Sequence, residues 1–380
     1  MNSKSSFNTL DSNSPDLSEA NSVIVGSRKR IDEIDAQLVG LLNQRAALAV
    51  QIGVSKMAVG QESLCPARES EIMRRILEMS EGPMPRKEMG QIFSEIISVC
   101  RNLQKPPTIA FLGPETTFSH MVALNRFGHS SELRPLHSIM DVFQEVENGR
   151  ASFGVVPVEN SIEGGVSATM DCFVNSGLRI SGEIYASIRH MLMSSEPSPD
   201  CIKRVYSHPQ ALNQCRKWLN QNMRGVDLHD CSSTAEAARR VSEETGAGAI
   251  ASSMAARKLG LNILAQNIQD RSDNKTRFLI IGPGTCKSTG DDKTSLYFIS
   301  RHQSGSLCRA LNNFSNRGIN LSRIESRPLK DRPWEYSFFV DCEGHMEDSN
   351  LAECLKDLRN NVEFLKILGS YPRMDPDIGI

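Results

Sequence analysis

Residues 108–283 alternate between short apolar runs and helical stretches, and this alternation constrains the fold more than any other feature of the chain. The strand-like runs are residues 108–112, 153–158, 179–187, 202–207, 248–251 and 278–281. Strands that alternate with helices are typical of an α/β domain whose sheet is mostly parallel. Because open α/β sheets bind ligands at their strand ends, polar residues at those ends are candidate site residues.

Small and hydroxyl-bearing residues follow several of the predicted strands. They include Thr116 and Thr117, Ser161 with Gly164 and Gly165, and Ser232, Ser233 and Thr234. Thr276 stands just before the apolar run that begins at Phe278. Backbone N–H groups and the positive ends of the helices that follow could bind carboxylates. Each residue alone is an ordinary helix cap, but their joint placement favours an anion-binding cleft.

The motifs at these strand ends resemble those of the prephenate dehydratase family. The matching stretches are residues 113–120, 159–165 and 207–210, and Thr276-Arg277-Phe278. The resemblance implies a domain with two lobes, like those of periplasmic binding proteins, and a site between the lobes. In this family prephenate loses CO₂ and its ring hydroxyl together and becomes aromatic, so the enzyme mainly assists the departure of hydroxide.

The departing hydroxide needs a proton donor or a strong hydrogen-bond donor. The resemblance assigns this role to Thr276, supported by Asn160 and Gln210, and leaves open whether Thr276 donates fully or relays through water. The further substrate-binding positions that it implies are Thr117, Ser161, Glu163, Gly164, Gly165, His208, Ser233, Thr234, Asn274, Arg277 and Phe278. His120 and His208 are rival acids because histidine titrates near neutral pH, but we expect them to be structural or substrate-positioning. Thr116 stands where the family usually has glycine.

Residues 28–56 contain no proline and carry apolar side chains at helical spacing, which predicts a long helix. Arg45 and Lys56 fall on the apolar stripe of this helix. A charge on a buried stripe is costly unless it is paired, and one cation alone could be explained by snorkelling or an internal salt bridge. For Arg28, Arg45 and Lys56 together, a binding site for a small polyanion is the better interpretation.

Helix geometry limits which of these cations can share a ligand. Arg45 and Lys56 are eleven residues apart, about 16 Å of rise, which two long side chains can close. Arg28 lies about 25 Å from Arg45 along one helix, too far for both to hold the same small ligand. If the three cations serve one site, Arg28 must come from a second copy of the chain. The spacing therefore predicts an intertwined dimer.

Two further helices are predicted, one opened by Pro66 and one over residues 86–104. The three-helix pattern resembles the all-helical chorismate mutases, with matches at Arg28, Arg45, Lys56, Arg68, Glu69 and Gln104. The resemblance implies that the arginines hold the two carboxylates of chorismate, Lys56 and Gln104 hydrogen-bond its ether oxygen, and Glu69 holds its ring hydroxyl. Such a rearrangement needs a fixed conformer and placed charge rather than a covalent catalyst. Cys65 and Cys100 depart from the family pattern, but neither removes a cation.

After a polar linker at residues 284–292, the chain predicts strands at 294–300, 320–326, 336–342 and 364–369, and helices at 306–316 and 351–359. The order βαββαβ is that of a ferredoxin-like module. It resembles an ACT domain of the phenylalanine-binding type, with Ser306 in place of the usual alanine. The effector positions that the resemblance implies are Gly305, Ser306, Leu307, Asn320, Leu321, Glu325, Ser326, Arg327 and Pro328. The alternative is a plain dimerisation module.

Composition excludes several other classes of function. The chain has 43 basic and 45 acidic residues, so no strong field suggests a nucleic-acid or membrane partner. The Ser- and Asn-rich residues 1–26 lack the apolar core of a signal peptide and are expected to form a disordered tail. The ten cysteines have no Cys-x-x-Cys spacing, which favours reduced thiols, a cytoplasmic location and no metal site.

The three resemblances together imply a multidomain, bifunctional enzyme of phenylalanine biosynthesis that needs no cofactor. Its expected parts are a mutase domain (residues 27–105), a two-lobed dehydratase domain (108–283) and an ACT domain (293–372), acting on chorismate and prephenate under inhibition by L-phenylalanine. A homodimer or higher homo-oligomer is expected. One alternative keeps the dehydratase but has a degenerate mutase domain that only dimerises. Another is a non-catalytic amino-acid-binding regulator.

Overall fold

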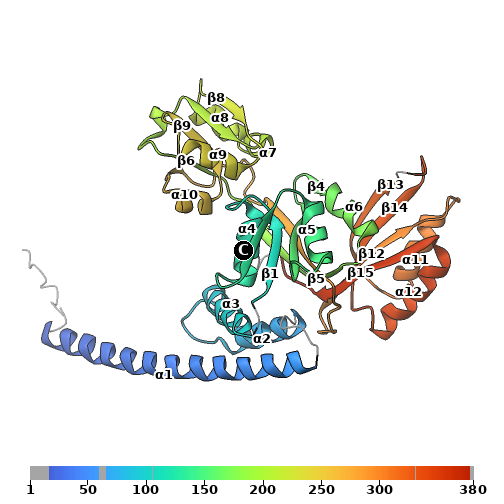
Figure 1. Ribbon diagram of the computed structural model, residues 1–380, viewed down its shortest axis with the longest axis horizontal. Coiled ribbons are helices and arrows are strands. Elements are labelled where there is room, and N and C mark those ends of the chain that lie inside the picture. Colours follow the sequence, from blue (N-terminus) through green and yellow to red (C-terminus); the bar gives the residue numbers. More distant parts are fainter. Residues whose placement is uncertain (1–16, 60–65, 105, 330, 377–380) are drawn as a thin grey trace, which may run out of the picture.

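The computed structural model describes residues 17–59, 66–104, 106–329 and 331–376 of the 380-residue chain. These residues form three regions that follow one another along the sequence: a helical region, a two-lobed α/β region and a C-terminal α+β region (Figure 1). The order is the one expected from the sequence. Residues 60–65, which include Cys65, lie outside the described residues.

The helical region contains α1 (Leu17–Ala58), α2 (Pro66–Met79) and α3 (Arg86–Asn102). The long α1 extends along one side of the molecule, away from the other regions (Figure 1). It begins eleven residues before Arg28, so residues 17–26 are helical and the expectation of a disordered tail is wrong for them. Adding residues to an existing helix costs little, and no proline interrupts this stretch.

The first lobe of the α/β region is built on a sheet with the strand order β2-β1-β3-β11-β5. Its strands are β1 (Thr108–Leu112), β2 (Glu132–Leu136), β3 (Phe153–Asn160), β5 (Arg179–Ser187) and β11 (Lys275–Gly282), and the short β4 (Gly164–Gly165) pairs with β3. Three helices pack on it: α4 (Phe118–Phe127), α5 (Ile139–Glu147) and α6 (Ser167–Asn175). Buried aromatic and aliphatic side chains cover both faces of this sheet.

The second lobe is an insertion between β5 and β11, with the strand order β10-β6-β9-β7-β8. Its elements are β6 (Met191–Ser194), β7 (Arg204–Ser207), α7 (Pro209–Gln214), α8 (Arg216–Asn222), β8 (Asp227–Asp230), α9 (Thr234–Val241), β9 (Ala247–Ala251), α10 (Ser253–Leu259) and β10 (Asn262–Ala265). In each sheet all strands on the main path but one run in the same direction, as the expectation of mostly parallel sheets predicts. The reversed strands are β11 in the first lobe, which returns from the second lobe and runs antiparallel to β3 and β5, and β6 in the second lobe.

The C-terminal region has the predicted order βαββαβ. Its elements are β12 (Asp292–Ile299), α11 (Ser306–Ser315), β13 (Leu321–Pro328), β14 (Tyr336–Glu343), α12 (Ser349–Asn361) and β15 (Phe364–Pro372). The antiparallel sheet has the strand order β13-β14-β12-β15. One face packs on α11 and α12, while Tyr297, Phe339 and Leu368 on the other face join the core of the first lobe. The C-terminal sheet is therefore in direct contact with the first lobe.

Among the residues that the structure describes, no helix is long and apolar enough to cross a membrane. The same residues contain no group of three or more His, Cys, Asp or Glu side chains that could hold a metal ion.

Candidate active sites

Thr276 and Asn160 face each other on adjacent strands of the first lobe. Thr276 is the second residue of β11, and the register pairs it with Asn160 at the end of β3. The Asn160 Nδ2 atom lies 2.9 Å from Thr276 Oγ1. Both residues are buried, with relative exposures of 9% and 8%. The sheet thus brings together two residues that are 116 positions apart in the sequence.

The hydrogen bonds of Asn160 determine which way its amide points. Its Oδ1 atom accepts the backbone N–H groups of Ile162 at 3.0 Å and Glu163 at 3.2 Å. The NH₂ group therefore faces Thr276 and donates to Oγ1, because an amide oxygen cannot donate. Since Thr276 accepts in this contact, its own O–H proton remains available to a substrate.

A chain of amides extends this arrangement into the second lobe. Asn160 Nδ2 also donates to Asn274 Oδ1 at 2.8 Å, and Asn274 Nδ2 donates to Gln214 Oε1 at 3.1 Å. The same Gln214 oxygen lies 2.9 Å from His190 Nε2, so that nitrogen must carry the proton. Burial lowers the pKa of His190, which favours the neutral ring.

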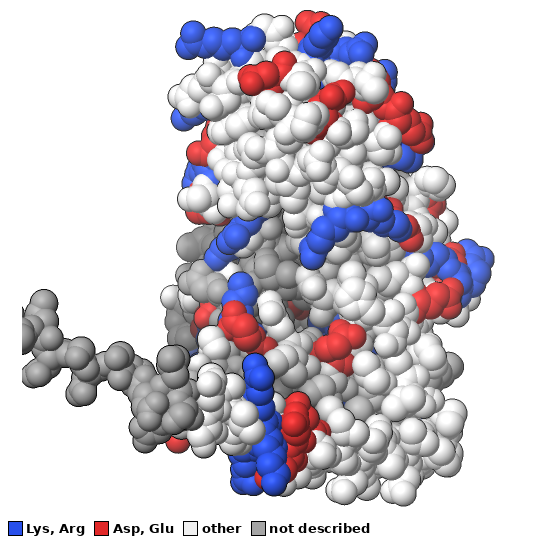
Figure 2. Space-filling model, turned by 90° about the vertical axis from the view of Figure 1, so that its left-hand side faces the viewer, with Lys and Arg blue, Asp and Glu red and all other residues white. Residues whose placement is uncertain are grey.

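Glu163 joins the two lobes. It follows β3 in the first lobe, and its carboxylate accepts hydrogen bonds from Gln210 and Gln214 on α7 of the second lobe. The Gln214 contact is 3.0 Å long. In a side view the surface is hollowed below the second lobe, and Lys and Arg side chains lie along the margin of the hollow (Figure 2). The carboxylate bridge and the amide chain thus meet where the lobes meet.

The other substrate-binding positions that the dehydratase resemblance implies lie on several elements of the two lobes. Ser161 Oγ accepts the N–H of Lys275, next to Thr276 in the chain, at 3.0 Å. Thr117, His208 and Ser233 cap α4, α7 and α9, each accepting a backbone N–H, and Thr234 begins α9. Gly164 has φ +84°, which favours glycine, and Gly165 lies against Glu325 of the C-terminal region. Phe278 is buried in the core of the first lobe.

Arg277 does not join the cluster around Thr276. Successive side chains of a strand point to opposite faces of the sheet, and the Arg277 guanidinium is held by Glu183 of β5, Asp341 of β14 and Tyr371 of β15. It is 5% exposed. The structure therefore places this predicted substrate-binding residue at the contact with the C-terminal region, where its hydrogen bonds are taken.

His120 is occupied by a structural contact. Its Nδ1 atom accepts the backbone N–H of Thr116 at 2.9 Å, and its ring stacks on Phe111 with 4.9 Å between the centroids. Burial lowers the pKa of His120, so its neutral form is favoured. A neutral ring that already accepts a hydrogen bond at Nδ1 supports the expected structural role.

In the helical region, Gln104 lies against the face of α1 that carries Arg45 and Lys56. A Cβ atom at Gly53 would come within 2.7 Å of the Gln104 side chain, so glycine allows this close approach. Gly53 lies one turn before Lys56, and Arg45 and Lys56 are half-buried on the same face. Gln104 Oε1 is buried and has no hydrogen-bond partner among the residues that the structure describes. Arg28 is exposed near the other end of the helix.

The two predicted effector stretches lie on separate elements of the C-terminal region. Gly305, with φ +75°, precedes α11, where Ser306 is buried and Leu307 packs on the core of this region. Asn320 and Leu321 lie at the start of β13, an edge strand whose residues alternate in exposure. Glu325 and Arg327 face the dehydratase region, and Arg327 pairs with Asp171 at 3.2 Å, whereas Ser326 and Pro328 are exposed.

Three family models match the chain in the order of its three regions. They are chorismate mutase type II over residues 27–105, prephenate dehydratase over 109–285 and the ACT domain over 294–360. The prephenate dehydratase from Arthrobacter aurescens, solved in complex with L-Phe, is 35% identical with a TM-score of 0.66, covering 71% of this chain and 91% of that one.

Curated relatives match this chain along most of its length. A bifunctional chorismate mutase/prephenate dehydratase of Aquifex aeolicus is 47% identical over 350 residues, which cover 91% of this chain and 97% of the relative. A protein of the same name from Stutzerimonas stutzeri is 43% identical, covering 91% and 96%. The chain belongs to the bifunctional chorismate mutase/prephenate dehydratase family. Its regions are hereafter the mutase, dehydratase and ACT domains.

Two of the predicted mutase residues are engaged in salt bridges. The Glu69 carboxylate accepts from Arg101 of α3 at 2.7 Å and from Arg126 of α4, in the dehydratase domain, at 2.6 Å. Arg68 pairs with Glu71 at 2.6 Å on the surface. Glu69 is thus directed toward the dehydratase domain rather than left open to a ligand. Cys100, which departs from the family pattern, is buried in α3.

Sequence reasoning missed Gln214 and His190 in the dehydratase domain. Gln214 lies four residues after Gln210, and this spacing places both side chains on one face of α7. That spacing was a usable signal. His190 gave none, because its partner lies 24 residues away and their approach depends on how the second lobe folds.

Proposed function

We propose that this family member converts chorismate to prephenate in its mutase domain and prephenate to phenylpyruvate in its dehydratase domain, with L-phenylalanine as inhibitor. The observation that carries the dehydratase assignment is the Thr276–Asn160 contact. Its direction leaves the threonine proton available where the two lobes meet. A cytoplasmic location remains a prediction from the sequence.

In the dehydratase step, the Thr276 hydroxyl donates to the ring hydroxyl of prephenate as the C–O bond breaks and water leaves. The electrons of the C–C bond to the departing carboxylate enter the ring, which becomes aromatic as CO₂ is released. Asn160 holds Oγ1 in place and stabilises negative charge that develops there. A proton from solvent then restores the hydroxyl.

For the mutase we propose a site shared between two copies of the chain. Arg45, Lys56 and Gln104 would supply one half and Arg28 of a second copy the other. The apolar side chains of α1 support this arrangement, because Ile34, Leu38 and Leu41 are 44%, 50% and 60% exposed in a single chain. Exposed apolar side chains at regular helical spacing need a covering partner. A second α1 packed along this stripe would cover them.

For the ACT domain we propose L-phenylalanine as the ligand. The Arthrobacter aurescens dehydratase was solved with L-Phe, and the stretches at Gly305 and at Glu325 match the phenylalanine-binding type. The exposed side of β13 leaves room for a second ACT domain beside it. The effector would bind where two ACT domains pair, and would inhibit by binding more tightly to a less active state.

The test follows prephenate and phenylpyruvate from chorismate, with and without L-phenylalanine, in the full-length protein. We expect both products, with less phenylpyruvate when L-phenylalanine is present. Thr276→Ala should remove most dehydratase turnover, about 10²-fold or more for a lost proton donor, and leave mutase turnover near normal. Thr276→Ser should retain part of the rate because it keeps a donor.

The possible failures point to different alternatives. Prephenate turnover without chorismate turnover would leave a mutase domain that only dimerises. Loss of both activities with retained L-phenylalanine binding would indicate an amino-acid-binding regulator. If Thr276→Ala turns over prephenate like the wild type, the assignment of the donor is wrong.

A further inference from the structure

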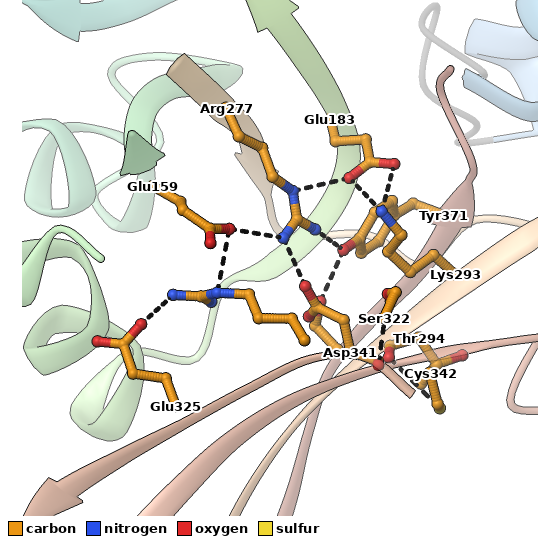
Figure 3. A network of polar contacts seen from close by, with 12 residues as sticks. Glu159, Glu183, Arg277, Lys293, Thr294, Ser322, Glu325, Asp341, Cys342 and Tyr371 are labelled. Atoms are coloured by element: carbon orange, nitrogen blue, oxygen red, sulfur yellow. Dashed lines mark hydrogen bonds and ion pairs between the residues drawn. The ribbon is translucent and has the colours of Figure 1, made fainter. Parts of the chain in front are cut away.

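The residue after Thr276 connects the catalytic strand to the ACT domain. Arg277 Nε donates to Glu183 at 2.8 Å, Nη1 to Asp341 at 2.5 Å and Nη2 to the Tyr371 hydroxyl at 2.9 Å (Figure 3). Glu183 belongs to the dehydratase domain, whereas Asp341 and Tyr371 belong to ACT strands β14 and β15. Each of the three guanidinium nitrogen atoms therefore donates a hydrogen bond to a residue of the dehydratase domain or the ACT domain.

The surrounding charges balance and are almost fully buried. Lys293 Nζ lies 2.9 Å from both oxygens of Glu183, and its side chain is 6% exposed. Burial alone would raise the pKa of Asp341, but the charges of Arg277 and Arg323 and the hydrogen bonds from Ser295 and Arg277 together outweigh burial and lower this pKa, so the carboxylate stays ionised. Removing one charge from such a group leaves another buried and uncompensated, which is costly.

A second connection links the ACT domain to Asn160, the hydrogen-bond partner of Thr276. Glu159 precedes Asn160 on β3 and pairs with Arg323 of ACT strand β13 at 3.2 Å. Arg323 also pairs with Glu325, one of the predicted effector residues, and Glu325 lies against Gly165 of the dehydratase domain. Both Thr276 and Asn160 thus have a neighbour in the chain that is held by the ACT sheet.

We propose that Arg277 is a positioning residue of the dehydratase, and that its ACT partner Asp341 makes the position of Thr276 depend on the effector. This inference rests on the proposed function. Because Thr276 and Arg277 are adjacent in the chain, a change in the hydrogen bonds that hold Arg277 also moves the Thr276 hydroxyl. A misplacement of 1 Å can cost about 10²-fold in rate. L-Phenylalanine would inhibit by favouring an arrangement of the ACT domain in which the contact between Asp341 and Arg277 differs.

The first variant is Asp341→Asn in the full-length protein, which keeps the shape of the side chain and removes its charge. We expect calorimetry to show L-phenylalanine binding within about threefold of the wild-type affinity, while saturating L-phenylalanine leaves at least about tenfold more dehydratase activity than it leaves in the wild type. The factor of ten corresponds to a coupling loss of about 1.4 kcal/mol. Asp357→Asn is the matched control, because it breaks the Arg317–Asp357 pair inside the ACT domain, away from β11. It should be inhibited normally.

The second variant, Arg277→Lys, keeps the positive charge but loses the forked geometry. We expect its kcat for prephenate to fall about tenfold with KM within twofold. A rise in KM at unchanged kcat would instead mean that Arg277 binds substrate, and would overturn the positioning role. If Asp341→Asn does not fold, Asp341→Glu takes its place with the same expected loss of inhibition.

The outcomes separate this inference from the proposed function. A wild-type protein without dehydratase activity or without inhibition by L-phenylalanine would refute the proposed function. If the wild type is inhibited and saturating L-phenylalanine inhibits Asp341→Asn to the same extent, only the coupling through Arg277 is refuted. Loss of L-phenylalanine binding in Asp341→Asn would also refute it, because Asp341 would then act on the effector site itself.

Discussion

At Thr116 the backbone has a φ of +70°, a left-handed conformation that crowds the Cβ atom of any residue except glycine. Backbone contacts hold it there, because its N–H donates to His120 Nδ1 at 2.9 Å and its C=O accepts from Ser252 Oγ at 2.8 Å. The family preference for glycine at this position thus has a physical reason. Threonine retains the turn at a cost in stability.

Thr116→Gly should stabilise the dehydratase domain. The substitution relieves a steric cost of about 1–2 kcal/mol in the folded state. It also raises the entropy cost of folding by about 0.5–1 kcal/mol, because glycine has more freedom in the unfolded chain. The net gain in stability is about 0.5–1 kcal/mol. Thermal unfolding followed by circular dichroism would detect a higher Tm. A lower Tm would show that the buried Thr116 side chain contributes more than the strain costs.

Asn160→Asp should inactivate the dehydratase while preserving its fold. One carboxylate oxygen can still accept the N–H groups of Ile162 and Glu163, but the other would face Thr276 and accept its proton. The donor would then be taken up inside the protein, so we expect kcat to fall about 10²–10³-fold. Steady-state kinetics with prephenate measures the loss. Asn222→Asp, on the surface of the second lobe, controls for the added charge and should be neutral.

Residue identity could be predicted from sequence better than residue direction. The motif around Thr276 identified its hydroxyl as a candidate donor, and in the structure Asn160 donates a hydrogen bond to this hydroxyl. The same motif included Arg277, which lies on the opposite face of the strand. Which face carries the substrate depends on the packing of β11 between β3 and β5 and against the ACT sheet, none of which is local in sequence.

At the scale of elements, a salt bridge of Glu69 connects α2 of the mutase domain to α4 of the dehydratase domain. Its side chain is 12% exposed and pairs with Arg101 and Arg126. Burial alone would raise the pKa of Glu69, but the charges and hydrogen bonds of Arg126 and Arg101 together outweigh burial and lower this pKa below its usual range. A carboxyl with a depressed folded pKa stabilises the fold above its unfolded pKa, about 4.3, and the contribution is lost as the pH falls through the folded pKa.

Glu69→Gln should therefore lower the stability of this junction at pH 7 by about 3 kcal/mol, since it leaves two arginines without their anion. The difference between variant and wild type should shrink progressively as the pH falls from about 4 through the depressed pKa of the folded wild-type carboxyl, because protonation then removes its charge. Scanning calorimetry at several pH values measures both effects. Glu71→Gln, which removes the exposed partner of Arg68, should change little. A difference that is independent of pH would contradict the ionic contribution.

The elements that sequence patterns missed are mostly short edge strands. β2 contains Pro135 and lies at the edge of its sheet, where the missing N–H of proline is tolerated. β8 is an exposed edge strand with the sequence Asp-Leu-His-Asp, which has no apolar alternation. The longer buried strands β1, β3, β5 and β11 were all predicted because burial on both faces leaves continuous apolar runs.

At the scale of the whole molecule, the exposed stripe of α1 leads to a test of shared mutase sites. If each site takes Arg28 from one copy and Arg45 from the other, Arg28→Ala and Arg45→Ala homodimers should both be nearly inactive mutases. In a mixed dimer one site carries both lesions and the other is intact. The heterodimer, purified with two tags, should recover about half of the wild-type rate if the sites are independent.

The controls for this experiment are the two parent proteins, which must stay folded and dimeric. Their dehydratase turnover, which does not use Arg28 or Arg45, serves as the internal standard. A heterodimer as inactive as its parents would show that each chain builds its mutase site alone.

The two chain crossings between the lobes lie side by side, since the N–H of Ile188 donates to the C=O of Asn274 at 2.8 Å. Both crossings are thus beside Asn274, two residues before Thr276, so we expect the second lobe to turn about this point if it moves relative to the first. Swinging the second lobe outward about this point would part Gln210 and Gln214 from Glu163 but would leave Asn160 on Thr276. The product could then escape at the cost of a few amide hydrogen bonds, with the reacting pair still assembled for the next substrate.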